Sequence, residues 1–162
     1  MIRPLLALLL LVATTGCGRL ADRRLDRIAR AVAQRDTVAY LTPFGVPTRP
    51  FSPAVRVGNL ILLAGQIGTT GADATGTLVP GGIEAETRQT MENIRTVLAA
   101  VGSSMDRVVK CTVMMADMAE WDRMNAVYRT YFAPGRLPAR SALGANGLAL
   151  GARVEIECLA AR

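Results

Sequence analysis

The sequence predicts one domain in which helices alternate with the strands of a sheet, in the order ββαβαβ, and three observations favour it. Residues 54–57 and 60–64 are short apolar runs joined by Gly-Asn, a dipeptide typical of a hairpin turn. Residues 83–101 carry apolar side chains at helical spacing and precede Gly102, a residue type that commonly ends a helix. Residues 153–160 predict a strand, because Val154-Glu155-Ile156-Glu157 alternates apolar and acidic side chains as a half-buried strand does.

The rest of the domain follows the same alternation. Residues 108–116 predict a strand, and residues 117–132 predict a second helix that begins at Asp117, with Glu120 spaced as its capping-box partner. A further strand is expected near residues 140–145. We interpret the apolar side chains of the second helix as core rather than as ligand contacts; they are Trp121, Met124, Val127, Tyr128 and Tyr131.

Two helices cover only one face of such a sheet, so the other face needs a cover from elsewhere. The alternation predicts the members of that second face, which are Val108, Lys110, Thr112, Met114, Glu155 and Glu157. A sheet face without a covering layer favours self-association of the chain.

Composition narrows the classes of function. The chain has 162 residues, which suffices for one domain with a hydrophobic core. Its net charge is +6, but much of the basic excess lies in residues 19–35, so the charge does not indicate a nucleic-acid-binding domain. The sequence contains no histidine, which excludes Ser-His and Cys-His nucleophilic machinery and disfavours a catalytic zinc site.

The N-terminus has the features of an export signal. Arg3 precedes an apolar run over residues 5–13, which is too short to span a bilayer. The following Ala-Thr-Thr-Gly-Cys, residues 13–17, resembles a bacterial lipoprotein processing box, although Thr14 stands where such boxes usually carry Leu or Val. We therefore expect Cys17 to be lipidated and the protein to be exported and anchored to a membrane.

We expect three segments to precede the folded domain. Residues 1–17 form the signal peptide; the alternative is an ordinary secretory leader cut near Gly16, with the cysteine left as a free thiol. Residues 18–36 predict a basic amphipathic helix, which either lies on anionic headgroups or docks on its own domain. Residues 37–50 are rich in proline and predict a linker, so the folded domain is expected to begin near Phe51.

Arg140 and Glu155 are expected on nearby strand ends, where they would form a small polar site. Arg140 follows the turn-rich residues 133–138, and its guanidinium can hold a planar carboxylate through two parallel hydrogen bonds. Glu155 can hold and deprotonate a water molecule. The alternative is an Arg–Glu pair that closes the edge of the sheet.

Two cysteines, Cys111 and Cys158, alternate onto the apolar faces of their predicted strands, the first beside Val109, Val113 and Met115. We interpret them as buried reduced thiols. A disulfide between them is the alternative that an oxidising compartment permits, because the sequence does not reveal the order of the strands.

Five blocks of residues, in this order, resemble the RidA family of reactive enamine and imine deaminases over about residues 50–162. They are Phe51-Ser52-Pro53-Ala54-Val55 with Gly58-Asn59, Ala64-Gly65-Gln66-Ile67, Asn125-Ala126-Val127-Tyr128, Pro138-Ala139-Arg140-Ser141 and Val154-Glu155-Ile156-Glu157. The resemblance implies a chorismate-mutase-like α+β fold for residues 51–162, with two helices on one face of a mixed sheet. It also implies a homotrimer with clefts between its subunits.

The activity that the resemblance implies is the hydrolysis of 2-imino acids, and of enamines that tautomerise to them, to 2-keto acids and ammonia without a metal or cofactor. Arg140 corresponds to the arginine that binds the substrate carboxylate, and Glu155 to the glutamate that positions the water. Gly65 is expected to offer backbone contacts to the substrate, and Asn125 to line the cleft. No nucleic-acid partner is expected.

The chain departs from the family pattern at three positions. Ala142 replaces a cysteine, Ala64 replaces a serine, and Phe51 or Ala54 occupies the region of a tyrosine. We expect Phe51 and Ala142 to line a pocket more apolar than in the best-known deaminases. The alternatives are a non-catalytic trimer of the same fold that binds a small carboxylate, and a protein- or RNA-directed role.

Overall fold

The computed structural model describes residues 23, 26, 37–46, 48–71 and 76–162. The expected signal peptide and its Cys17 lie outside the described residues. Of the basic segment 18–36 the structure describes Arg23 and Asp26 alone, and both are helical. The chain divides into two units, Met1–Thr37 and Val38–Arg162, and the fold described below is that of the second unit.

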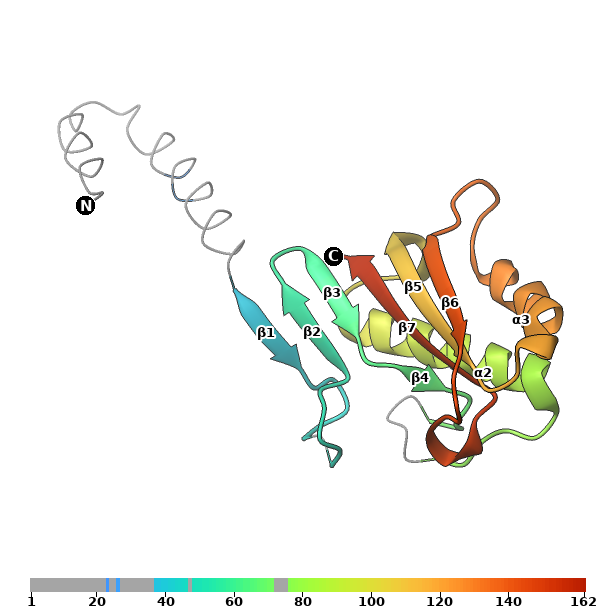
Figure 1. Ribbon diagram of the computed structural model, residues 1–162. Helices are drawn as coiled ribbons and strands as arrows, with labels where there is room; N and C mark the ends of the chain where they lie inside the picture. The colour runs from blue at the N-terminus through green and yellow to red at the C-terminus, as the bar shows by residue number, and fades with distance from the viewer. Residues whose placement is uncertain (1–22, 24–25, 27–36, 47, 72–75) are drawn as a thin grey trace, which may run out of the picture. The chain divides into compact units, whose positions relative to one another are not determined.

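The second unit is built on a seven-stranded mixed sheet (Figure 1). The strands are β1 (Val38–Leu41), β2 (Ala54–Val57), β3 (Leu60–Leu63), β4 (Gln66–Ile67), β5 (Val108–Met115), β6 (Ala139–Gly144) and β7 (Val154–Ala161). Their order across the sheet is β1-β2-β3-β7-β5-β6, with β4 also paired to β7. Only β5 and β6 pair in parallel among these strands; the other pairs are antiparallel.

Helices α2 (Gly82–Ala100) and α3 (Trp121–Tyr128) lie on the same side of the sheet (Figure 1). The core forms between them and the strands, and the apolar stripe predicted for residues 83–101 is buried, with Ile83, Met91, Ile94 and Leu98 fully covered. Helix α2 ends where predicted, because Gly102 takes a positive φ just after it. The predicted α+β fold is thereby confirmed.

The second helix is shorter than predicted. Residues 117–132 form three pieces, a 3₁₀ turn η3 (Met118–Glu120), then α3, then a 3₁₀ turn η4 (Arg129–Tyr131). The side chain of Asp117 accepts a hydrogen bond from the backbone N–H of Ala119 at 2.8 Å, which caps η3. Glu120 does not complete a capping box, because its carboxylate accepts a hydrogen bond from the Arg153 guanidinium at 2.9 Å instead. Two further 3₁₀ turns are η2 (Met105–Arg107) and η5 (Ala149–Gly151).

Strand β1 lies inside the stretch that we interpreted as a linker. It pairs antiparallel with β2, with Leu41 opposite Ala54, so the sheet begins upstream of Phe51. The prolines that disfavour a strand all follow β1, so their effect is confined to the connection between β1 and β2.

A β-bulge changes the facing of residues at the start of β5. The register between β5 and β7 shifts between Val108 and Lys110. Val108 therefore lies in the core, and Val109 is 48% exposed. The strict alternation that we expected from residue 108 was wrong at these two positions, and it holds from Lys110 onward.

Cys111 and Cys158 form a disulfide, and both side chains are fully buried. They occupy directly paired positions on the antiparallel strands β5 and β7, with a Cα–Cα distance of 4.1 Å. The prediction of burial was right, but the preferred interpretation as reduced thiols was wrong, because the pairing of these two strands brings the cysteines face to face.

Within the described part of the chain, no helix combines the length and apolar character that crossing a bilayer requires.

Candidate functional site

Arg140 lies on the helix side of the sheet, near its β6 edge. In the parallel pairing of β5 and β6 it stands opposite Cys111, whose side chain is in the core, and the guanidinium reaches α3. Its Nη1 donates a hydrogen bond of 2.6 Å to Oδ1 of Asn125. Its Cζ lies 4.9 Å from the ring centroids of both Trp121 and Tyr128, a distance at which cation–π attraction operates.

The three partners of Arg140 come from one face of α3. Trp121, Asn125 and Tyr128 are spaced i, i+4 and i+7, which places them in one row along a helix. We expected both aromatic residues to serve as core, and Tyr128 is indeed 4% exposed. Their contact with Arg140 was missed. The signal that could have revealed it is the amide of Asn125 in the middle of an otherwise apolar row.

The charge of Arg140 is not neutralised by a carboxylate in the described part of the chain, where the acidic groups that form ion pairs are Glu84, Glu86, Glu92 and Glu120. A half-buried guanidinium that is held by an amide and two rings keeps its full charge and most of its donors. Such a group can bind an anion.

Glu155 lies on the opposite face of the sheet. It alternates with the buried Val154 and Ile156 along β7, and it pairs with Met114 of β5 and Ile67 of β4. Burial, and to a smaller extent the neighbouring charge of Glu157, raises the pKa of its carboxyl above the ordinary value. A carboxylate with a raised pKa accepts a proton more readily, which suits a general base.

Gly65 lies directly against the Glu155 carboxylate. A Cβ atom added to Gly65 would stand 2.0 Å from Oε1 of Glu155, so no side chain fits there without displacing the carboxylate. The segment that follows Gly65 is fixed by Asn93 of α2, whose amide donates to the backbone oxygens of Ile67 at 3.0 Å and Thr69 at 2.9 Å. Helix α2 thus positions the loop that backs Glu155.

The predicted site residues therefore form two groups on opposite faces of the sheet. Arg140 and Asn125 are hydrogen-bonded on the helix side, where Ala142 also packs against the core. Gly65 and Glu155 adjoin on the open side. The pair of Arg140 and Glu155 that would close the sheet edge does not form, since neither residue takes part in an ion pair in the described structure. Phe51 lies in the segment before β2 and is 47% exposed.

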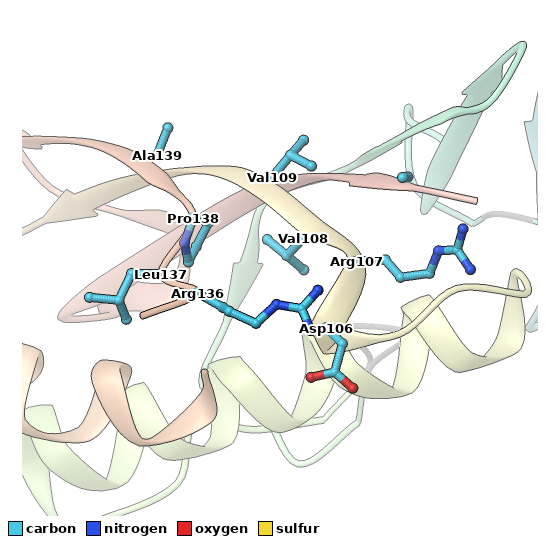
Figure 2. A pocket seen from close by; sticks show the side chains of 9 residues that line it. Asp106, Arg107, Val108, Val109, Arg136, Leu137, Pro138 and Ala139 are labelled. Carbon is cyan, nitrogen blue, oxygen red and sulfur yellow. The ribbon is translucent and has the colours of Figure 1, made fainter. Parts of the chain in front are cut away.

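A cavity of about 640 Å³ opens at a different place, where β5 and β6 begin and β7 ends (Figure 2). Its charged lining residues are Asp106, Arg107 and Arg136, and the Arg107 side chain points away from that of Arg136. None of the predicted site residues lines it. Among the described residues, no group of three or more histidine, cysteine or acidic side chains is arranged to hold a metal ion.

A family model and a similar mouse protein both match most of this chain. The family model described as endoribonuclease L-PSP matches residues 45–162. A mouse protein named 2-iminobutanoate/2-iminopropanoate deaminase is 43% identical over 111 residues, which are 68% of this chain and 80% of the mouse protein.

Solved structures are similar over most of this chain. Yeast Mmf1 is 30% identical with a TM-score of 0.69, covering 78% of this chain and 99% of that protein. RidA from the Antarctic bacterium Psychrobacter sp. PAMC 21119 is 31% identical with a TM-score of 0.67, covering 76% of this chain and 98% of that protein.

Proposed function

Because the chain belongs to the endoribonuclease L-PSP family, which is also the RidA family of the resemblance, we propose that it hydrolyses reactive 2-imino and enamine acids to 2-keto acids and ammonia. Relatives about 40% identical carry the name 2-iminobutanoate/2-iminopropanoate deaminase. The reaction needs a cation for the substrate carboxylate and a base for the attacking water, and the chain offers one candidate for each.

The observation that carries the proposal is the environment of Arg140. Its guanidinium is held by neutral partners, at 2.6 Å from Asn125 and 4.9 Å from two aromatic rings, and its charge is left for a ligand. A carboxylate can take two parallel hydrogen bonds from a guanidinium, which fixes both the position and the orientation of a small acid.

The second group of residues would supply the chemistry. Glu155 takes a proton from a water that adds to the imine carbon, while the C=N electrons move to nitrogen. The same carboxyl then returns the proton to nitrogen, which gives the carbinolamine. Its hydroxyl proton passes to the amine through the same carboxyl as the C=O bond forms and the C–N bond breaks, and the products are the keto acid and ammonia. The raised pKa of Glu155 favours the first transfer. Gly65 leaves room for the carboxylate beside its backbone.

The two groups lie on opposite faces of one chain, so we propose that they meet across subunits of a homotrimer. Arg140 sits near the β6 edge of one subunit, and Glu155 on the open face of the next. The open face also carries an apolar area, whose members are Val38, Tyr40, Val55, Val57, Leu60 and Leu62. Exposed apolar area of this kind is typical of a surface that another chain covers.

The three replacements in the family pattern favour a second candidate function. A hydroxyl or thiol is missing at each of the three positions, which are occupied by Ala64, Ala142 and either Phe51 or Ala54, and this leaves fewer polar groups for a transition state. The alternative is a trimer that binds a small carboxylate without turning it over. For either function we propose that Cys17 anchors the exported protein to a membrane, because it ends an apolar leader in a processing-box sequence.

One experiment separates the two functions. The chain is mixed with freshly generated 2-iminobutanoate, and ammonia release is compared with the spontaneous rate, beside an Arg140→Ala control. Acceleration that the control abolishes supports the deaminase. Binding of 2-oxobutanoate by calorimetry without any acceleration supports the binding trimer, and unchanged binding by the control removes Arg140 from the site.

A further inference from the structure

The guanidinium of Arg140 contacts two aromatic rings of one helix. Trp121 precedes Asn125 by one helical turn and Tyr128 follows it by nearly one, so their Cα atoms are separated by roughly 10 Å along the axis. The Arg140 Cζ is 4.9 Å from both ring centroids. Both rings therefore contact the same cation from one helix, and Asn125, between them in the sequence of α3, accepts a hydrogen bond from it at 2.6 Å.

We propose that Trp121 and Tyr128 are positioning residues that form an aromatic clamp on Arg140, and that occupancy of the anion site is transmitted directly to Trp121. The proposal rests on the proposed function only in that Arg140 receives a carboxylate. The clamp itself is a property of α3 and β6.

Aromatic partners can fix the Arg140 side chain without neutralising its charge. A long arginine side chain loses considerable rotamer freedom when it is fixed, and a carboxylate partner that fixed it would also neutralise the charge that a ligand needs. Aromatic faces attract the cation through their quadrupoles and leave its charge in place. An arginine positioned in this way binds its ligand without a further ordering cost.

The ring of Tyr128, and not its hydroxyl, carries this contact. The hydroxyl is buried and has no hydrogen-bond partner in the described structure. Burial raises the pKa of Tyr128 to about 12, against a smaller opposing effect of Arg140, so the side chain stays neutral in ordinary buffers. Replacing it with phenylalanine therefore preserves the clamp and removes an unpaired polar group.

The sequence supplies a spectroscopic probe, because Trp121 is the only tryptophan of the chain. We expect its fluorescence in the full-length protein to change as 2-oxobutanoate saturates the site, and we expect no change in Arg140→Ala. Trp121→Phe and Tyr128→Phe should bind 2-oxobutanoate within about twofold of wild type by calorimetry, since an aromatic face is kept. Trp121→Leu and Tyr128→Leu should bind it roughly threefold to tenfold more weakly.

Rescue by phenylalanine distinguishes a clamp from general packing. If the leucine variants bind 2-oxobutanoate as tightly as wild type, the clamp is overturned. Should Tyr128→Leu fail to fold, the half-buried Trp121 still provides its own leucine and phenylalanine pair. Ligand binding without ammonia release would defeat the proposed deaminase while leaving the clamp supported.

If wild type binds no keto acid, NMR of the ligand-free protein still tests the clamp. Ring currents from two aromatic faces should shift the Nε–Hε resonance of Arg140 away from those of the exposed arginines. In Trp121→Leu the resonance should move back toward them. A wild-type Arg140 resonance at the position of the exposed arginines would overturn the proposal.

Discussion

Removing the Cys111–Cys158 disulfide should destabilise the domain by about 4 kcal/mol. The two cysteines are separated by 47 residues, and the chain-entropy relation for a loop of that size gives this value at room temperature. The bridge joins β5 to β7 at the centre of the sheet, where both side chains are fully buried, so the folded state offers no relaxed alternative position for them. For a domain of this size the loss corresponds to a fall in Tm of about 15 °C.

The assay is chemical unfolding of the oxidised and the reduced protein, followed by the fluorescence of the single tryptophan. The matched control is the double variant Cys111→Ala/Cys158→Ala, whose unfolding midpoint should not respond to reductant. Thiol titration of unfolded wild type should detect at most one free cysteine, since Cys17 is the only other one in the sequence. Equal midpoints for oxidised and reduced wild type would show that the disulfide does not stabilise the domain, and three free thiols would show that it does not form.

Four further predictions address assembly, chemistry, the pH dependence of stability, and anchoring. Leu62→Asp places a charge on the open sheet face, where Leu62 is 39% exposed in the single chain, and light scattering should show a smaller species than the trimer proposed for wild type; an unchanged mass would remove this face from the interface. Glu155→Gln should keep 2-oxobutanoate affinity but lower turnover roughly 10²-fold to 10⁴-fold, and wild-type turnover should rise as pH increases through the raised pKa of Glu155. Folding raises the pKa of Glu155, so ionisation of its carboxyl lowers the stability of the folded protein. Glu155→Gln should therefore become more stable than wild type as the pH rises above the unfolded pKa of Glu155. Urea midpoints of the two proteins that do not diverge with pH would contradict this. Cys17→Ser should abolish incorporation of labelled fatty acid, and label that persists would disprove lipidation at this residue.

The elements with strong periodicity could be predicted from the sequence. Helix α2 has a long apolar stripe with a glycine just beyond its end, and the first half of β7 alternates apolar and acidic side chains. Strand β1 was not predicted, because four residues of weak pattern beside a proline-rich run carry little local signal. Its existence depends on pairing with β2, which is a tertiary interaction.

The candidate site was predicted residue by residue but not in its geometry. The sequence indicates Arg140 and Glu155, yet which face each occupies depends on the order and pairing of β5, β6 and β7. The same pairing brings Cys111 to Cys158, and it is set by contacts far apart in the chain. A bulge at the start of β5 likewise turns the Val109 side chain out of the core, and no local sequence pattern indicates this.

Ammonia release from freshly generated 2-iminobutanoate by wild type and by Arg140→Lys tests whether the guanidinium of Arg140 holds the carboxylate of a substrate that the protein hydrolyses. We expect wild type to accelerate the release and the lysine variant not to, because an ammonium keeps the charge but cannot form the two parallel hydrogen bonds of a guanidinium or contact the two rings in the same way. Circular dichroism of both proteins would confirm that the fold is intact. A lysine variant that is as fast as wild type, or wild type that never exceeds the spontaneous rate, would contradict the account.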